Sequence, residues 1–88
     1  MVENFRNKMA ESIMASGDQL WLIENDEKSD VQLWLIRDHT GYNDPLGRAD
    51  QFQVWRGNKR CYVGSNRQCA YADYRKQKEE FAADWALV

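Results

Sequence analysis

Residues 51–85 contain the stretch that decides the fold, QFQVWRGNKRCYVGSNRQCAYADYRKQKEEFAADW. Alternating apolar and polar residues flank Gly57-Asn58, a pair typical of the two-residue hairpin turns that need positive φ angles. We therefore expect a β-hairpin with Trp55 opposite Arg60. In this register the apolar face carries Phe52, Val54, Cys61 and Val63. The other face carries Gln51, Gln53, Trp55, Arg60 and Tyr62.

A helix is expected directly after this hairpin. Gly64 ends the second strand, and Ser65 to Gln68 has the spacing of a capping box, whose side chains satisfy the free N–H groups of a helix start. Apolar residues then recur every three or four positions, which predicts one stripe that packs on the sheet. The stripe consists of Ala70, Tyr74, Gln77, Phe81, Trp85 and Val88.

Residues 2–16 predict another amphipathic helix, with Phe5, Met9 and Ile13 on one face. Gly17 stands where a left-handed C-terminal cap is expected. Packing against a core explains this stripe better than anchoring to a membrane, because the polar face has only Arg6 and Lys8 as basic residues.

The pentapeptide Gln-Leu-Trp-Leu-Ile occurs twice, at residues 19–23 and 32–36. Both copies have the composition of strands, and the polar residues between them suit a hairpin loop. Folding the chain about Glu27-Lys28 sets Trp21 opposite Trp34. Both faces of this hairpin are then apolar, unlike those of an antiparallel sheet with one wet face. We therefore expect one of two arrangements. Either helices or the long loop cover the second face, or this face is an interface for a partner or a second copy.

Composition indicates one domain that spans residues 1–88. The chain is 43% hydrophobic and 30% charged, with a formal net charge of −2. No apolar run approaches the ~18 residues that a membrane-spanning helix needs, and none resembles a secretory signal. We expect a cytoplasmic protein with no membrane association.

The charge is unevenly distributed along the chain. Residues 1–50 carry ten acidic and five basic residues, whereas residues 51–88 carry seven basic and four acidic ones. Between Arg56 and Lys78 the single acidic residue is Asp73. This basic segment is either a solvated face or a patch that binds a polyanion.

The sequence contains no recognisable catalytic or metal-binding motif. Residues 38–50 predict a long loop in which His39, with Asp38 and Asp44, forms the one candidate acid–base group, and no nucleophile accompanies it. Cys61 and Cys69 lack zinc-site spacing and are expected as buried thiols. We therefore expect no enzyme, no cofactor and no metal.

Two resemblances bear on function. The basic hairpin that leads through Tyr-Val-Gly-Ser into an Ala-rich helix, Gly57 to Tyr74, resembles the strand-to-helix passage of AP2-type DNA-binding domains, in which a small sheet enters the major groove. The acidic first half and the paired Trp strands depart from that family, so no DNA-contacting role is transferred. The small, acidic, aromatic-rich chain also resembles the anti-CRISPR and anti-restriction inhibitors that bacteriophages and mobile elements encode.

These patterns predict an α+β domain in the order α-β-β-loop-β-β-α, with a four-stranded antiparallel sheet and both helices on one face. The leading functional hypothesis is a non-catalytic protein-binding domain that inhibits a larger host or defence complex. Aromatic and arginine anchors are typical of such interfaces. The candidate anchors are Trp21, Trp34, Trp55, Arg60 and Tyr62.

The alternative hypothesis is nucleic-acid binding through the second hairpin and the start of the last helix. Basic residues interleaved with aromatic ones offer phosphate contacts and base stacking together, and a capped helix start adds N–H groups. The candidate contacts are Arg56, Lys59, Arg60 and Arg67. The acidic first half and the sequence pI near 5.3 count against this hypothesis.

Overall fold

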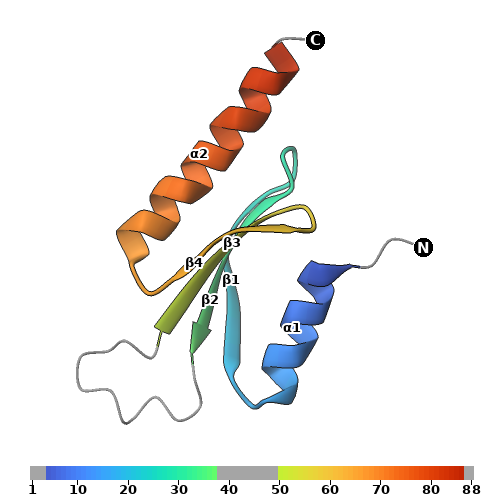
Figure 1. Cartoon of the computed structure of the whole chain (residues 1–88), viewed down its shortest axis with the longest axis vertical. Helices are drawn as coiled ribbons and strands as arrows, with labels where there is room; N and C mark the ends of the chain where they lie inside the picture. The colour runs from blue at the N-terminus through green and yellow to red at the C-terminus, as the bar shows by residue number, and fades with distance from the viewer. Residues whose placement is uncertain (1–3, 38–49, 87–88) are drawn as a thin grey trace.

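The computed structural model describes residues 4–37 and 50–86, with side chains described through residue 82. In chain order, one helix precedes four strands and a second helix follows them (Figure 1). The elements are α1 (Phe5–Ala15), β1 (Gln19–Asp26), β2 (Val31–Arg37), β3 (Asp50–Arg56), β4 (Lys59–Gly64) and α2 (Arg67–Ala86). The strands form one antiparallel sheet in the order β1-β2-β3-β4. The predicted α+β class, element order and sheet are confirmed.

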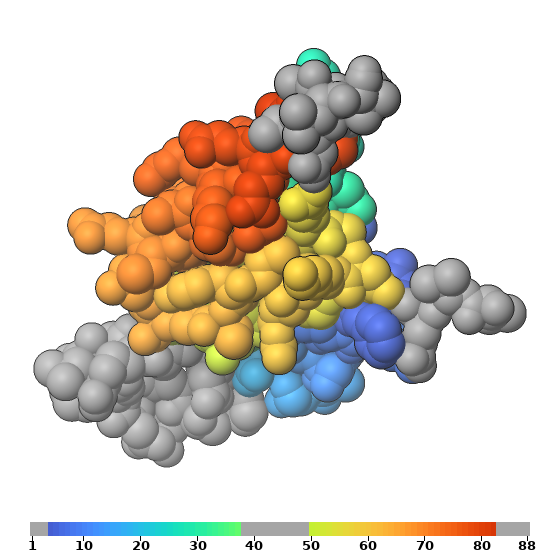
Figure 2. All heavy atoms as spheres, turned by 45° about the horizontal axis from the view of Figure 1, so that its top comes forward, coloured from blue at the N-terminus to red at the C-terminus, as the bar shows by residue number. Residues whose placement is uncertain are grey.

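The two helices pack on opposite faces of the sheet. Figure 1 shows the sheet from its edge with α2 on one side and α1 on the other, and in Figure 2 the second hairpin lies between them. Helix α2 contacts β2, β3 and β4, whereas α1 contacts β1 and β4. The prediction that both helices share one face is therefore wrong in this detail. Its cause is that both faces of the Trp-containing strands are apolar, so a helix is needed on each.

Strand alternation assigns the sheet residues to these two faces. The α2 face carries Val31, Leu33, Leu35, Phe52, Val54 and Tyr62. The α1 face carries Leu20, Leu22, Gln32, Trp34, Ile36, Gln51, Gln53, Trp55 and Arg60.

The core lies on the α2 face. Val31, Leu33 and Val54 are fully buried there, and Ala70 and Tyr74 of α2 pack against them. Ala70 and Tyr74 are the first two members of the predicted helical stripe, which confirms its orientation over this part of α2. The predicted stripe members Trp85 and Val88 lie outside the described side chains.

The first hairpin contains a β-bulge that changes its register. Leu22 pairs with Trp34 and Trp21 with Leu35, and the ladder then skips Ile23 so that Glu24 pairs with Leu33. The expected pairing of Trp21 with Trp34 is wrong, because these two side chains lie on opposite faces of the sheet. Ile23 packs against the core of the α2 face, on the same side as Trp21, and the extra residue brings Glu24 onto this face as well.

The second hairpin also contains a bulge. Gly57 has a φ of +59°, as the first central position of a primed turn requires, and Trp55 pairs with Arg60 as expected. Beyond that pair the register shifts at Cys61, so that Tyr62, rather than Cys61, lies opposite Val54. Val63 therefore turns away from the core and is 47% exposed.

Both helices have side-chain caps at their starts. At the start of α1 the Asn4 side chain accepts a hydrogen bond from the Asn7 N–H. At its end the Gly17 N–H donates to the Met14 carbonyl and the Asp18 N–H to the Ile13 carbonyl, and the φ of +89° at Gly17 confirms the predicted left-handed cap. Helix α2 is capped by Asn66, which accepts from the Cys69 N–H, and not by the predicted Ser65.

An ion pair joins β2 to β3 at the end of the sheet opposite the two turns. The Arg37 guanidinium donates two hydrogen bonds to the Asp50 carboxylate, at 2.8 and 3.0 Å, and lies 5.5 Å from the centre of the Trp21 ring. Hydrogen bonding from Arg37 holds the pKa of Asp50 below its ordinary value.

This ion pair predicts a pH-dependent effect on stability. Arg37→Gln will raise the pKa of Asp50 toward the ordinary value of an aspartate, as a carboxyl-carbon NMR titration can measure. Because its pKa is lowered in the folded protein, ionised Asp50 stabilises the fold at pH values above its ordinary pKa. This contribution is lost as the pH falls through the lowered pKa. The stability difference between wild type and variant will therefore shrink below pH ~4; a difference that persists unchanged contradicts the assignment.

A matched pair of substitutions tests the core assignment. Val54 is fully buried and Val63 is 47% exposed, so the same truncation removes packing at one position only. Val54→Ala will lower the free energy of unfolding by about 2–3 kcal/mol, from lost burial and the cavity left behind. Val63→Ala will lower it by less than about 1 kcal/mol. Urea unfolding measures both; equal costs would contradict the alternation described here.

Candidate protein-binding groove

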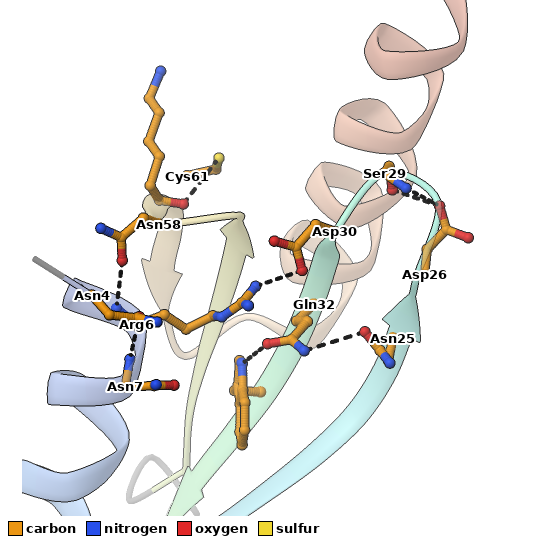
Figure 3. A network of polar contacts seen from close by, with 12 residues as sticks. Asn4, Arg6, Asn7, Asn25, Asp26, Ser29, Asp30, Gln32, Asn58 and Cys61 are labelled. Carbon is orange, nitrogen blue, oxygen red and sulfur yellow. Dashed lines mark hydrogen bonds and ion pairs between the residues drawn. The ribbon is translucent and has the colours of Figure 1, made fainter. Parts of the chain in front are cut away.

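The start of α1 is fixed to both hairpin turns by Arg6 (Figure 3). The Arg6 N–H donates to the Asn58 side-chain oxygen at 3.0 Å, and the guanidinium donates to the Asp30 carboxylate at 2.9 Å. The Asp30 carbonyl in turn accepts from the Gly57 N–H at 2.8 Å. One arginine thus joins elements that are 24 and 52 residues away in the chain.

Asp30 is able to make these contacts because of its backbone conformation. Its φ of +56° is left-handed, a region that Asp and Asn tolerate better than most residues. The carboxylate is thereby presented toward α1 while the carbonyl bonds to the second turn. The sequence shows Asp30 only as one acid in a polar loop, and nothing in its spacing indicates this role.

A groove of about 480 Å³ opens between α1 and the β3–β4 hairpin. It is lined by Phe5, Lys8, Met9, Trp55, Asn58 and Arg60. Trp55 is only 5% exposed and lies on the floor, whereas Phe5 is 53% exposed. The groove therefore combines a fixed aromatic floor with an apolar side chain open to solvent.

Glutamine side chains hold the aromatic floor in place. The Trp55 ring N–H donates to the Gln53 side-chain oxygen at 2.9 Å, and the Gln53 amide donates to Gln51 at the same distance. A parallel chain on β2 runs from the Trp34 ring N–H through Gln32 to Asn25. These bonds satisfy the buried amide of Gln53 and restrict the rotamers of both tryptophans.

The charge of the groove lining is positive. Within the described part of the chain its ionisable residues are Lys8 and Arg60, and both are exposed. Among the residues that the structure describes, the lining includes no carboxylate. An apolar side chain flanked by acidic residues is the chemistry that this lining complements.

The structure divides the predicted protein-binding residues between two surfaces. Trp34, Trp55 and Arg60 lie on the α1 face, and Trp55 and Arg60 line the groove. Trp21 and Tyr62 lie on the α2 face, on the two opposite edge strands. The five side chains do not form one patch. Phe5, Lys8 and Met9 complete the groove, and sequence reasoning assigned them only to a core-packing helix.

The residues of the nucleic-acid alternative are also separated. Arg56 lies 3.6 Å from Glu80 of α2, and Arg60 points to the other face. Arg67 lies beyond the far end of β4, with its guanidinium 5.6 Å from the centre of the Phe52 ring. Lys59 and Arg60 remain exposed beside the turn. The basic segment of the sequence is therefore not one continuous surface.

A second cavity lies between the first turn and the C-terminal half of α2. It has a volume of about 530 Å³ and is lined by Asp26, Lys28, Lys78, Phe81 and Ala82. The Ser29 hydroxyl hydrogen-bonds to Asp26 and lowers the pKa of that carboxyl. The lining of this cavity includes both acidic and basic side chains. The Lys78 ammonium lies over the Tyr74 ring, 5.1 Å from its centre.

Other sequence-predicted features have the following outcomes. Asp38, His39 and Asp44 lie outside the described residues. Both cysteines are free; Cys61 is half-buried, which raises its thiol pKa, while Cys69 is exposed on the solvent side of α2 rather than buried as expected. Within residues 4–37 and 50–86, no cluster of three metal-ligating side chains occurs. No described helix has the length and apolarity to cross a membrane.

A substitution at Asn58 tests how α1 is held over the groove. Asn58→Ala removes the acceptor for the Arg6 N–H, and loss of such an acceptor at a helix start costs about 0.5–2 kcal/mol. Hydrogen exchange at the Arg6 amide will therefore become faster. Asn58→Asp is the matched control, because it keeps an acceptor oxygen and will preserve slow exchange; acceleration by both variants would contradict the role of this bond.

Comparison with known proteins gives no relative: no family model, curated protein or solved structure matches the chain. The geometry of the groove and the distribution of charge therefore carry the functional assignment.

Proposed function

We propose that this protein is a small non-enzymatic binding domain, and that the groove between α1 and the β3–β4 hairpin captures an acidic segment of a larger protein. An apolar side chain of the partner would lie on Trp55 between Phe5 and Met9. Carboxylates on either side of it would reach Lys8 and Arg60. The observation that carries the proposal is that the described lining residues include three apolar side chains and two cations and no acid.

Energetic considerations favour a protein partner for such a groove. Tryptophan and arginine are enriched among the residues that dominate interface energies. Trp55 is already held by Gln53, so little rotamer entropy is lost when a partner binds. The exposed Arg60 adds electrostatic steering toward an acidic partner.

We further propose that the protein acts as an accessory inhibitor of a host or defence complex, in the cytoplasm of a host cell. The support for this role is compositional: the chain is short, acidic overall and rich in aromatic residues. A small domain with a cationic groove suits the blocking of an acidic site on a larger assembly. The lining groups bind and orient, and no catalytic step is part of this proposal.

Nucleic-acid binding is the competing reading of the same exposed cations. Helix α1 lies across the sheet face that carries Arg60, so this face is not free to enter a groove of DNA. Arg56 and Arg67 belong to other parts of the surface. These placements favour a protein partner over a polyanion.

The proposal is tested with synthetic probes and the isotope-labelled intact chain. A peptide of alternating Glu and Leu will shift the amide resonances of Phe5, Met9, Asn58 and Arg60, whereas a Lys-Leu peptide will not. Arg60→Glu will weaken binding by about tenfold or more, because attraction becomes repulsion. Arg75→Glu is the matched control on the outer face of α2, and it will change the affinity by less than about twofold, since salt screens distant charges.

Three results would contradict the proposal. The acidic peptide does not bind, its shifts map outside the groove, or the two arginine variants weaken binding equally. Tight binding of a labelled duplex or single strand that weakens steeply with salt would instead support the nucleic-acid alternative. In that case Arg56→Glu combined with Arg60→Glu will abolish the shift of the labelled strand.

A further inference from the structure

Strand β1 forms an edge of the sheet with an unpaired outer side. The strand order is β1-β2-β3-β4, and within the described ranges 4–37 and 50–86 no strand pairs with β1 other than β2. The outer side of an edge strand presents N–H and C=O groups that are able to pair with another chain. Proteins commonly protect such edges with charges or proline. Neither occurs in Gln19–Ile23, the uncharged first half of β1.

Exposed apolar side chains concentrate at this edge. Trp21 is 41% exposed on the α2 face and Leu22 is 42% exposed on the α1 face. Met14, 67% exposed, lies in the last turn of α1, which leads directly into β1. These are three of the five large hydrophobic side chains that are exposed in the described part of the chain. Single exposed apolar residues are ordinary, but a cluster beside an unpaired edge indicates an interface.

The sequence of this edge already pairs with a copy of itself within the molecule. Gln19–Ile23 and Gln32–Ile36 have the same five residues and lie antiparallel in the first hairpin, with Leu20 opposite Ile36 and Leu22 opposite Trp34. The inner side of β1 thus shows that two such segments are compatible as neighbouring antiparallel strands. Its outer side offers the same segment to a second chain.

We propose that the protein forms a two-fold symmetric dimer in which the β1 edges of two chains pair and extend the sheet to eight strands, twice the four of one chain. An axis perpendicular to the sheet and centred on Trp21 sets this side chain beside the partner's Trp21. It also sets Leu20 opposite the partner's Leu22. Antiparallel pairing about such an axis keeps each face on its own side, so apolar groups meet apolar groups on both faces.

The distribution of charge limits this dimer to the first half of β1. Glu24 and Asp26 follow the bulge at Ile23 and lie at the two outer ends of the symmetric interface, where each Glu24 comes next to the partner's Asp18, so that like-charge repulsion confines the pairing to residues 19–23. The other pairing open to β1 is with a neighbour's β4, where Lys59 and Arg60 would meet these acids. That contact is heterologous and would produce a ring or an open series of chains. The uncharged, self-complementary segment favours the closed dimer.

The dimer is tested with the protein alone, so its outcome is independent of the groove and its acidic peptide. Sedimentation of the wild type over a concentration series will show a monomer–dimer equilibrium. Leu22→Lys places two like charges at diagonal positions of the interface, each opposite the partner's Leu20, and will raise the dissociation constant by at least about tenfold. Val63→Lys on β4 is the matched control, with similar exposure, and will leave the constant within about twofold.

A charge-swap mixture separates a lost interface from a misfolded variant. Leu22→Lys and Leu22→Glu will each sediment as monomers with unchanged circular dichroism, and an equimolar mixture of the two will form the dimer again. Amides of residues 19–22 in the wild type will also gain protection from hydrogen exchange as the concentration rises. A wild type that stays monomeric at millimolar concentration would overturn the proposal. So would species larger than a dimer that Val63→Lys disrupts, because they indicate pairing through β4.

Discussion

The absence of a wet face on the central hairpin is the constraint on which the fold depends. Each copy of Gln-Leu-Trp-Leu-Ile places large apolar side chains on both sides of its strand, so a helix on one face leaves the other exposed to water. The chain meets this constraint by placing α2 over one face and α1 across the other. A short chain is thereby built in three layers, and each helix covers a different set of strand residues.

The two helices are held on the sheet in different ways, and this difference produces the groove. Helix α2 buries Ala70 and Tyr74 in the core, whereas α1 has no fully buried residue in its described length. Polar contacts from Arg6 to Asp30 and Asn58 therefore fix the start of α1 to the hairpin turns. Because few apolar contacts draw α1 into the sheet, space remains between it and Trp55. The candidate binding site is thus a consequence of a helix that is anchored at its end.

The regular parts of this architecture follow from sequence pattern alone, and the irregular parts do not. Alternation around Gly57-Asn58 predicted the second hairpin, and the spacing of Ala70 and Tyr74 predicted the buried side of α2. Two β-bulges, at Ile23 and Cys61, then reversed the orientation of residues that alternation had assigned. A bulge adds one residue without any distinctive composition, so its position depends on packing against the helix and not on local propensity. The same limit applies to Arg6 and Asp30, whose interaction depends on tertiary placement.

The bulge at Ile23 also links the core of the monomer to its unpaired edge. Without the bulge, strict alternation would leave Trp21 and Ile23 on the α2 face. It would place Glu24 on the α1 face, among the apolar side chains that lie beneath α1. With the bulge, Glu24 and Asp26 lie on the α2 face together with Ile23, near Tyr74, whose pKa is raised by burial and by these acids. The irregularity divides β1 into an uncharged half and an acidic half. It therefore sets which part of the edge is able to accept another strand, since only the first half combines free backbone groups with apolar side chains on both faces.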